Sequence, residues 1–403
     1  MSDIPEGVRK ISTQNLDEGM YVVDLGFSWL DNPYLYAKEG LVPGRKAADA
    51  IRAEGFLEVF VDPARSKTPI PDDDLNKVVN GHVSLEALTP KVALEDEIQG
   101  ASRLYGEALG FARSALDRCA WQKPLDMDRV EPVVAGMMDS LSRNGAALIT
   151  LSKLRKSSDH LFNHAVNVAV LAMYFGRFLG LHPITLRRIG QAGLFHDIGM
   201  SQVPDVVLRN RGKLSENDLA LVRRHPAAGH EVLQQQADIY PEVLEGALEH
   251  HERFNGNGYP RGLSGNDISV VGRILALADS YDALTSDRPH RKALPPHKAL
   301  SVIYGMRGQD FDPSFVERFI QGVGVYPLGS AVELNTGQSG VVIRANPENP
   351  LRPVVSLLTD PRGWPVPPRT VDLSGQNALR IVNCKESATL RAAIHDGLGV
   401  PEE

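Results

Sequence analysis

Seven side chains that could bind metal ions lie in one part of this chain. They are His164, His196, Asp197, His225, His250, His251 and Asp279. Ten of the twelve histidines fall between His160 and His297, so the imidazoles are concentrated in one domain. A mixed histidine and aspartate set without a thiolate favours iron or manganese, with catalytic zinc or nickel as alternatives. Two such ions can generate a hydroxide at neutral pH and stabilise the entering and leaving oxygens at phosphorus, so the expected chemistry is phosphoester hydrolysis.

Asp197 is the candidate to bridge two metal ions. The small, apolar stretch at residues 191–195 carries His196 and Asp197 into the interior of a helical packing, and Asp279 likewise lies within an apolar helical sequence. A buried carboxylate without a partner is costly, and a divalent cation supplies that partner. Because a carboxylate has two oxygens, it can bind two ions where an imidazole binds one.

Helices must position these ligands. His160 and His164 are four residues apart, on one face of a predicted helix that runs until Gly180 and Pro183 can end it. Both imidazoles could therefore point into the core of a helical bundle.

Local sequence patterns predict the positions of the remaining histidines on helices. Ser215 begins a capping-box pattern that opens a helix, and this helix must close before Pro226, which puts His225 at a helix end. His250 and His251 would be about 100° apart on a helix. Two adjacent imidazoles in this arrangement are reasonable where two ligands converge on one ion.

The hydrophobic pattern predicts a multidomain, mainly α protein. The predicted regions are a small α+β accessory module (1–75), a helical linker region (76–144), an all-α helical bundle with the ligands (145–325) and a small β-rich unit (326–403). The first has β-like stretches at 20–23 and 57–61 and a helix near 45–53, and the last has β-prone runs at 331–335, 340–344 and 354–358.

Two segments connect these regions. The prolines and aspartates of residues 68–74 indicate a linker. An amphipathic helix over residues 92–116 should pack against its own domain, with dimerisation as the alternative.

Composition excludes several classes of protein. A net charge of −7 argues against a general binder of nucleic acid polymers, which needs a basic surface. The two cysteines, Cys119 and Cys384, form no framework and suit a reducing compartment. No signal peptide and no run of about 18 apolar residues is visible, so we expect a cytoplasmic protein without a membrane span.

Four motifs resemble those of the HD-GYP domain. They are His196-Asp197-Ile198-Gly199, His250-His251-Glu252-Arg253, Gly256-Asn257-Gly258-Tyr259-Pro260 and the segment from Asp279 to Arg288. This family belongs to the HD superfamily of metal-dependent phosphohydrolases and hydrolyses the bacterial second messenger cyclic di-GMP. The resemblance covers residues 151–322 and implies a central HD-type helical bundle. Residues 18–24 are similar to a module often found ahead of such domains.

The resemblance allots the ligands to two ions. His164, His196, Asp197 and Asp279 would hold one ion, and His225, His250 and His251 the other, with Asp197 bridging. Asp197 and His196 would thus lie at the catalytic centre. Some members bind a third ion through a glutamate one helical turn before the first histidine, where this chain has His160.

The resemblance also implies substrate and partner contacts. Tyr259, Arg288 and Arg291 match positions near the substrate phosphates, where guanidinium groups can form forked hydrogen bonds. The exposed Gly-Tyr-Pro loop at residues 256–260 is linked in the family to contacts with diguanylate cyclase (GGDEF) domains. Met200 stands where the family commonly has lysine, which removes a positive charge, and Asn255 replaces an aspartate.

The sequence therefore predicts a phosphodiesterase that hydrolyses cyclic di-GMP to pGpG by attack of a metal-bridging hydroxide, with further cleavage to GMP left open. One alternative is a weakly active or inactive metal-bound sensor of cyclic di-GMP, or a partner-binding module. Another is a phosphohydrolase for a different signalling nucleotide, such as cyclic GMP-AMP. The oligomeric state is open, with a homodimer among the options.

Overall fold

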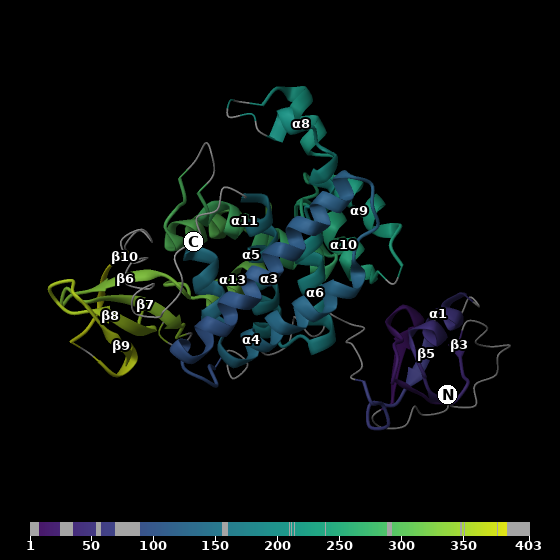
Figure 1. Ribbon diagram of the computed structural model, residues 1–403, viewed down its shortest axis with the longest axis horizontal. Helices are drawn as coiled ribbons and strands as arrows, with labels where there is room; N and C mark the ends of the chain where they lie inside the picture. Colours follow the sequence, from purple (N-terminus) through teal and green to yellow (C-terminus); the bar gives the residue numbers. More distant parts are fainter. Residues whose placement is uncertain are drawn as a thin grey trace. The chain divides into compact units, whose positions relative to one another are not determined.

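The fold is mainly helical, with a small sheet towards each end of the chain (Figure 1). The computed structural model describes residues 8–24, 35–53, 58–68, 89–154, 160–208, 210, 212, 214–237, 239–287, 292–346, 349, 351–376 and 378–384. The chain forms two compact units, Met1–Gly81 with Leu181–Leu186, and His82–Gly180 with Arg187–Glu403. The predicted fold class is confirmed.

The N-terminal unit is a small α+β structure. Its elements are β1 (Arg9–Ser12), β2 (Tyr21–Val22), β3 (Leu35–Tyr36), β4 (Gly40–Leu41), α1 (Arg45–Ala53) and β5 (Glu58–Val61). The sheet order is β1-β5-β2-β4, and β3 pairs in parallel with β5. Leu16, Met20 and Val59 are fully buried in its core. The predicted strands and helix of this region are confirmed, whereas the predicted linker lies outside the described residues after Thr68.

Eleven α-helices follow α1 among the described residues. They are α3 (Leu94–Ala120), α4 (Met127–Leu154), α5 (His160–Phe178), α6 (Pro183–Phe195), α7 (Asp205–Leu208), α8 (Glu216–Val222), α9 (His225–Gln234), α10 (Pro241–Glu249), α11 (Val270–Thr285), α12 (Pro296–Gly305) and α13 (Pro313–Val323). The helices predicted to start near residue 92 and to end before Gly180 are confirmed as α3 and α5.

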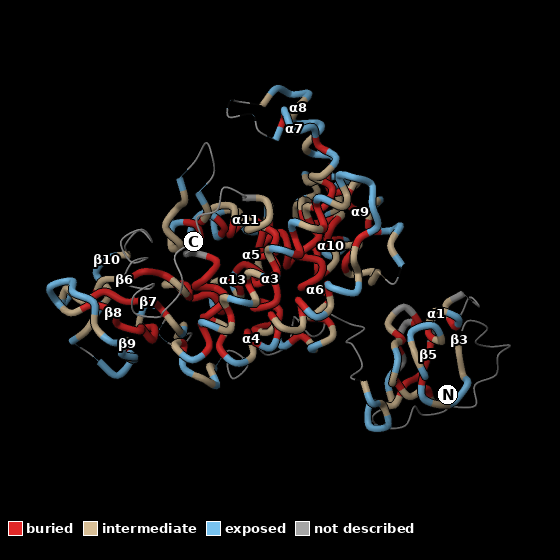
Figure 2. The backbone as a smooth tube through the Cα atoms, viewed as in Figure 1, coloured by how far each residue is buried: buried red, intermediate tan, exposed pale blue. Residues whose placement is uncertain are grey.

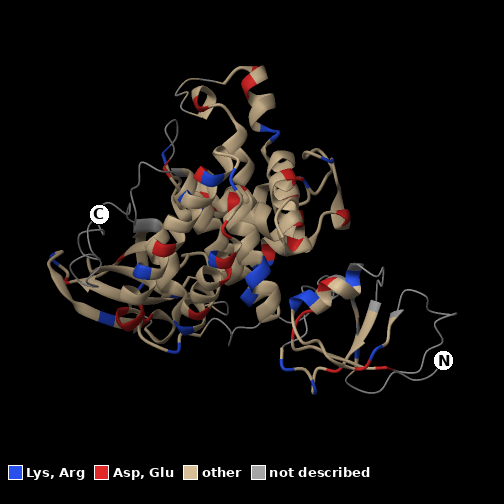
Figure 3. Cartoon of the chain, turned by 45° about the vertical axis from the view of Figure 1, so that its right-hand side comes forward, with Lys and Arg blue, Asp and Glu red and all other residues tan. Residues whose placement is uncertain are grey.

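Helix α5 lies at the centre of the helical packing. Residues 165–176 are all buried, and the tubes around the α5 label in Figure 2 are largely red. A helix that is apolar all round must be enclosed by other elements, and α5 packs against α3, α4, α11 and α13. Acidic and basic residues are interspersed along the surrounding helices (Figure 3). The core thus forms a rigid base for the residues at the end of α5.

The C-terminal strands form one antiparallel sheet. They are β6 (Ala331–Leu334), β7 (Ser339–Arg344), β8 (Val354–Thr359), β9 (Pro365–Asp372) and β10 (Ile381–Cys384), in the order β10-β6-β7-β8-β9. The three predicted strands are confirmed. The sequence reasoning missed β9 because it contains Pro365, Pro367 and Pro368. Prolines are tolerated there since, among the described strands, β9 pairs with β8 alone and lies at the edge of the sheet.

Candidate metal centre

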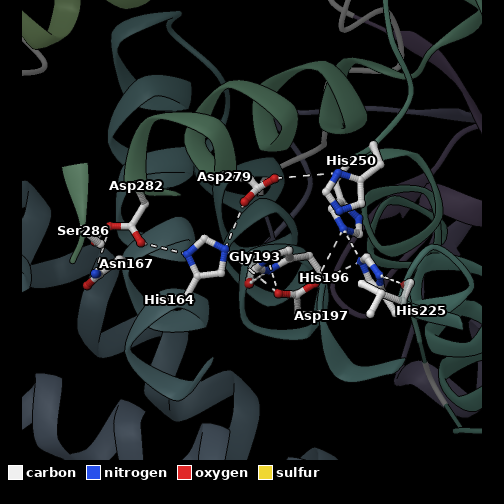
Figure 4. Close-up of polar contacts among 12 residues, drawn as sticks. His164, Asn167, Gly193, His196, Asp197, His225, His250, Asp279, Asp282 and Ser286 are labelled. Carbon is white, nitrogen blue, oxygen red and sulfur yellow. Dashed lines mark hydrogen bonds and ion pairs between the residues drawn. The ribbon is translucent and has the colours of Figure 1, made fainter. Parts of the chain in front are cut away.

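The structure brings all seven predicted ligands together, and Figure 4 labels six of them. His164 comes from α5 and Asp279 from α11. The other five lie at helix ends: His196 and Asp197 follow α6, His225 opens α9, and His250 and His251 follow α10. Three sets of ligand atoms lie within 4.8 Å of one another: His225 with His250 and His251, His164 with His196 and Asp279, and His196 with Asp197 and His250.

Asp197 lies between two groups of histidines. Its Oδ1 is 3.1 Å from His225 Nε2 and 3.8 Å from His250 Nε2. Its Oδ2 is 3.5 Å from His196 Nε2 and 4.0 Å from His164 Nε2. Each carboxylate oxygen therefore faces a different pair of imidazoles, as a ligand shared by two cations requires.

Three of the histidines are oriented by the ends of helices. The Nδ1 atom of each lies within hydrogen-bonding distance of the carbonyl oxygen three residues earlier: His196 with Gly193 at 2.8 Å, His225 with Val222 at 2.7 Å, and His250 with Ala247 at 3.0 Å. The last carbonyls of a helix have no partner within the helix, so an imidazole N–H can donate to them. With the proton on Nδ1, the Nε2 lone pair of each ring faces the cluster.

This arrangement of lone pairs fits bound cations. His225 Nε2 and His250 Nε2 are only 3.0 Å apart, and each ring uses Nδ1 to donate to a carbonyl. Two lone pairs at this distance repel unless a proton or a metal ion lies between them. His196 Nε2 is buried and has no hydrogen-bond partner among the described residues. A buried nitrogen without a partner is costly, and a metal ion would remove that cost.

His164 is held by side chains instead of the backbone. Its Nδ1 lies 2.8 Å from Asp282 Oδ2, and its Nε2 lies 2.9 Å from Asp279 Oδ1. Asp282 Oδ1 accepts hydrogen bonds from Asn167 Nδ2 at 3.0 Å and from Ser286 Oγ at 3.2 Å (Figure 4). A carboxylate behind a ligand histidine fixes its tautomer and makes it a stronger ligand.

The sequence reasoning missed the role of Asp282. A usable signal was present, because Asp282 follows Asp279 by three residues in the same apolar helix, so both carboxylates lie on one face. Asp282 is 1% exposed, and a carboxylate so deeply buried needs donors around it.

The electrostatics of the cluster favour ionised carboxylates and neutral rings at His250 and His251. Burial alone would raise the pKa of Asp197, but the adjacent His196, His225 and His164 hold it well below its usual range. Burial, reinforced by the neighbouring imidazoles, holds the pKa of His250 well below its usual range. Burial also lowers the pKa of His251 to about 4. Neutral imidazole and ionised carboxylate are the forms that bind metal ions.

Two glycines allow the close backbone approaches that the cluster needs. An added Cβ at Gly193 would lie 2.5 Å from Ala169 Cα, so α6 can lie against α5 only with glycine there. This contact brings the rings of His164 and His196 to a centroid distance of 5.3 Å. At Gly199 an added Cβ would lie 2.1 Å from the carbonyl oxygen of His225. The glycine of the His-Asp-Ile-Gly motif is therefore required where the segment after Asp197 meets α9.

The helix-end prediction for His225 needs a correction. The capping box at Ser215 is present and α8 ends at Val222, ahead of Pro226. His225, however, is the first residue of α9, and Pro226 lies in the first turn of that helix. Proline fits this position because its missing N–H would have no intrahelical acceptor there. The predicted helix breaker thus begins a second helix.

The Gly-Tyr-Pro loop packs beside the cluster. The N–H of Tyr259 donates to the carbonyl of His251 at 3.2 Å, and the two rings lie with centroids 4.9 Å apart and planes tilted by 31°. Buried Glu252 accepts from the N–H groups of Arg261 at 2.7 Å and Leu263 at 2.9 Å, which fixes the far end of the loop. At Gly258 an added Cβ would lie 2.2 Å from the nitrogen of Arg253.

The side chains of three predicted site residues lie outside the described part of the structure. Arg288 and Arg291 lie outside the described residues, and so does the side chain of His160. Asn255, the other departure from the family pattern, accepts from the N–H of Asn257 at 2.9 Å and donates to Gln309 Oε1 at 3.1 Å. Its amide therefore supports the loop from outside the ligand cluster.

Comparison with known proteins identifies the family. Residues 150–315 match the family model of the HD domain. A cyclic di-GMP phosphodiesterase of Pseudomonas aeruginosa is 33% identical over 373 residues, which cover 91% of this chain and 89% of that protein. The chain belongs to the HD-GYP family. It is therefore a hydrolase of the metal-dependent HD type, in agreement with the histidine and aspartate cluster.

Other HD-GYP relatives match mainly the central domain. The cyclic di-GMP phosphodiesterase response regulator RpfG of Xanthomonas campestris is 41% identical over 36% of this chain and 38% of its own. A 3'3'-cGAMP-specific phosphodiesterase of Vibrio cholerae is 33% identical over 39% of this chain and 36% of its own. The central domain is thus shared by enzymes named for two cyclic dinucleotides.

Two further family models match the flanking regions of this HD-GYP chain. Residues 8–130 match a domain of unknown function, DUF3391, and residues 331–393 match a KOW domain associated with the HD domain. Among the described helices of the chain, none is both long enough and apolar enough to cross a membrane.

Proposed function

We propose that this chain hydrolyses cyclic di-GMP to pGpG with two divalent metal ions. The observation that carries the proposal is the position of Asp197, whose two oxygens face separate groups of histidines. One ion would be held by His164, His196, Asp197 and Asp279, and the other by His225, His250, His251 and the second oxygen of Asp197. The names of the relatives from Pseudomonas and Xanthomonas support this substrate.

The ligand chemistry supports iron or manganese as the native metal, because imidazoles and carboxylates occur together without a thiolate. Bound ions would supply a hydroxide at neutral pH and neutralise charge on the phosphoryl group. The chain's own residues hold the Nε2 atoms of His196, His225 and His250 towards the centre, and Asp197 lies between these rings. We also propose that His160 could hold a third ion and that the protein is cytoplasmic.

The test is hydrolysis by the full chain, purified without oxygen and reconstituted with iron(II) or manganese(II). Cyclic di-GMP and 3'3'-cGAMP should be compared at one metal concentration, with pGpG resolved from GMP. We expect faster turnover of cyclic di-GMP. The Vibrio relative makes 3'3'-cGAMP the second candidate substrate, and faster turnover of that nucleotide would select it instead. If a chain with two bound ions did not hydrolyse either nucleotide, the enzyme proposal would fail and a role as a sensor or partner-binding module would be favoured.

Met200→Lys separates the enzyme from the sensor. Met200 lies three residues after the ligand Asp197, is partly buried, and donates its N–H to the carbonyl of Asp197. A partly exposed cation contributes about 1 kcal/mol or less, so we expect the rate to rise by about fivefold or less. Rates should be measured at saturating manganese and substrate. A much larger gain would mean that Met200 has disabled the parent site, which favours the sensor.

Tyr259, Arg288 and Arg291 are the proposed contacts to the substrate phosphates, and Arg223 is a further candidate. The guanidinium carbon of Arg223 lies 5.7 Å from the centre of the Tyr259 ring. Arg223 is exposed and pairs with no carboxylate among the described residues. A cation beside Tyr259 is available to bind the anionic substrate in place of the lysine replaced by Met200.

We expect Arg223→Gln to raise the KM for cyclic di-GMP by about fivefold, the effect of losing about 1 kcal/mol of attraction at an exposed position. The metal content should not change. Arg224→Gln is the matched control, because Arg224 is the adjacent exposed arginine and, among the described residues, Arg223 is the arginine that faces the Tyr259 ring. Equal KM values for the two variants would contradict a role for Arg223 in binding.

The Gly-Tyr-Pro loop is also the proposed contact for GGDEF domains. Asn257 and Pro260 are its exposed residues, and the rest of the loop is half-buried against the ligand cluster. Binding of a partner to these two residues would therefore occur beside Tyr259. A homodimer stays a prediction.

A further inference from the structure

A chain of buried hydrogen bonds connects α3 to the metal ligand His164. The hydroxyl of Tyr105 on α3 donates to Asn167 Oδ1 at 2.6 Å. Asn167 Nδ2 donates to Asp282 Oδ1 at 3.0 Å, and Asp282 Oδ2 lies 2.8 Å from His164 Nδ1. Figure 4 shows the last two of these links. Four side chains from three helices thus form one connected path.

Each link determines the orientation of the next. A Tyr105 O–H that donates to the amide oxygen of Asn167 leaves the amide NH₂ facing Asp282. The NH₂ then supports one oxygen of Asp282, while the other oxygen receives the imidazole N–H of His164. The exposed fractions of Tyr105, Asn167 and Asp282 are 0%, 3% and 1%, so water cannot readily replace a missing partner.

We propose that Tyr105 is a positioning residue for the metal ligand His164, so that α3 is part of the metal centre. This helix lies outside the residues that match the HD domain, 150–315, and within those that match the domain of unknown function, 8–130. The helical part of the DUF3391 region would therefore have at least one function, which is to hold a metal ligand in position through hydrogen bonds behind it. The inference rests on the proposed function in that His164 holds a metal ion.

Tyr105→Phe tests this role with the loss of a single oxygen. In the full chain we expect manganese(II) to bind about tenfold more weakly at one of its two sites, as measured by competition with a chelator, because the loss of groups behind a metal ligand typically weakens binding by about tenfold to a hundredfold. The manganese concentration for half-maximal hydrolysis should rise by the same factor. Saturating manganese should restore the rate.

Tyr174→Phe is the matched control. Tyr174 is also a buried tyrosine, 3% exposed, and its hydroxyl donates to the carbonyl of Gly322 at 3.1 Å, at a site away from the ligands. Both variants remove a hydroxyl that forms a buried hydrogen bond, so both should lower the unfolding temperature, but only Tyr105→Phe should weaken metal binding. Equal metal affinity in the two variants would overturn the proposal.

Asn167→Ser provides a second variant, should Tyr105→Phe fold poorly. It removes the next link, and we expect the same weakening of one manganese site. Parent-like metal affinity in Asn167→Ser would also overturn the proposal. Metal affinity can be measured without turnover, so a chain that binds manganese but does not cleave cyclic di-GMP would contradict the proposed function and still test the role of Tyr105.

Discussion

Asp197→Ala is expected to reduce the hydrolysis of cyclic di-GMP by about a thousandfold or more. Bound metal ions stabilise the charge that develops at phosphorus by several kcal/mol, and each 1.4 kcal/mol corresponds to about tenfold in rate. Asp197 is the residue whose two oxygens face both groups of histidines, so its loss should disturb both ions. Single-turnover rates and metal content should be measured on the same preparation.

The matched control is Asp267→Ala, which removes an exposed carboxylate outside the cluster. We expect this variant to retain the rate and metal content of the parent. Asp197→Asn adds a sharper comparison, because the amide keeps the size of the side chain but lacks the charge of a bridging ligand. If Asp197→Ala kept the parent's rate with two bound ions, Asp197 could not be the shared ligand.

Gly199→Ala is the second substitution with a large expected effect. The added Cβ would lie 2.1 Å from the oxygen of His225 and 2.5 Å from the nitrogen of Gly229. Both atoms belong to the backbone of α9, so no side-chain rotation can relieve the contact. Helix α9 must move away, and His225 must move with it from Asp197. Displacing a catalytic group by about 1 Å can cost about a hundredfold in rate, which is the loss we expect.

The same substitution should lower the free energy of unfolding by about 1–3 kcal/mol, the typical cost of overpacking a core. Gly110→Ala is the control, since Gly110 lies on an exposed face of α3 and an added Cβ there meets nothing within 4 Å. Alanine at that position should stabilise the helix by up to about 1 kcal/mol. Denaturant unfolding and initial rates should be measured for both variants. A parent-like rate in Gly199→Ala would show that the site tolerates a shift of α9.

Local sequence signals were sufficient to locate most of the cluster's elements. The spacing of His160 and His164 predicted α5, the apolar sequence around Asp279 predicted α11, and Ser215 predicted the start of α8. These signals depend on periodicity and capping, which act over a few residues. The seven candidate ligands could be named in the same way, because imidazoles and carboxylates inside apolar sequence are unusual.

Contacts between distant segments could not be predicted in this way. Tyr105 and Asn167 are 62 residues apart, and nothing near either one indicates the other. The prolines of β9 argue locally against a strand. They are acceptable only because β9 lies at the edge of the sheet, and this position depends on its pairing with the distant strand β8. Pro226 was a correct signal for the end of one helix and a missed signal for the start of the next.

The two halves of the metal centre should differ in their tolerance of mutation. His196, His225 and His250 are oriented by carbonyl groups of Gly193, Val222 and Ala247. A substitution cannot remove a main-chain carbonyl, so these three ligands can keep their orientation while the side chains at those positions change.

His164 depends instead on the carboxylate of Asp282 and on the side chains behind it, each of which a single nucleotide change can delete. Mutations that silence the enzyme without touching a ligand should therefore accumulate around His164.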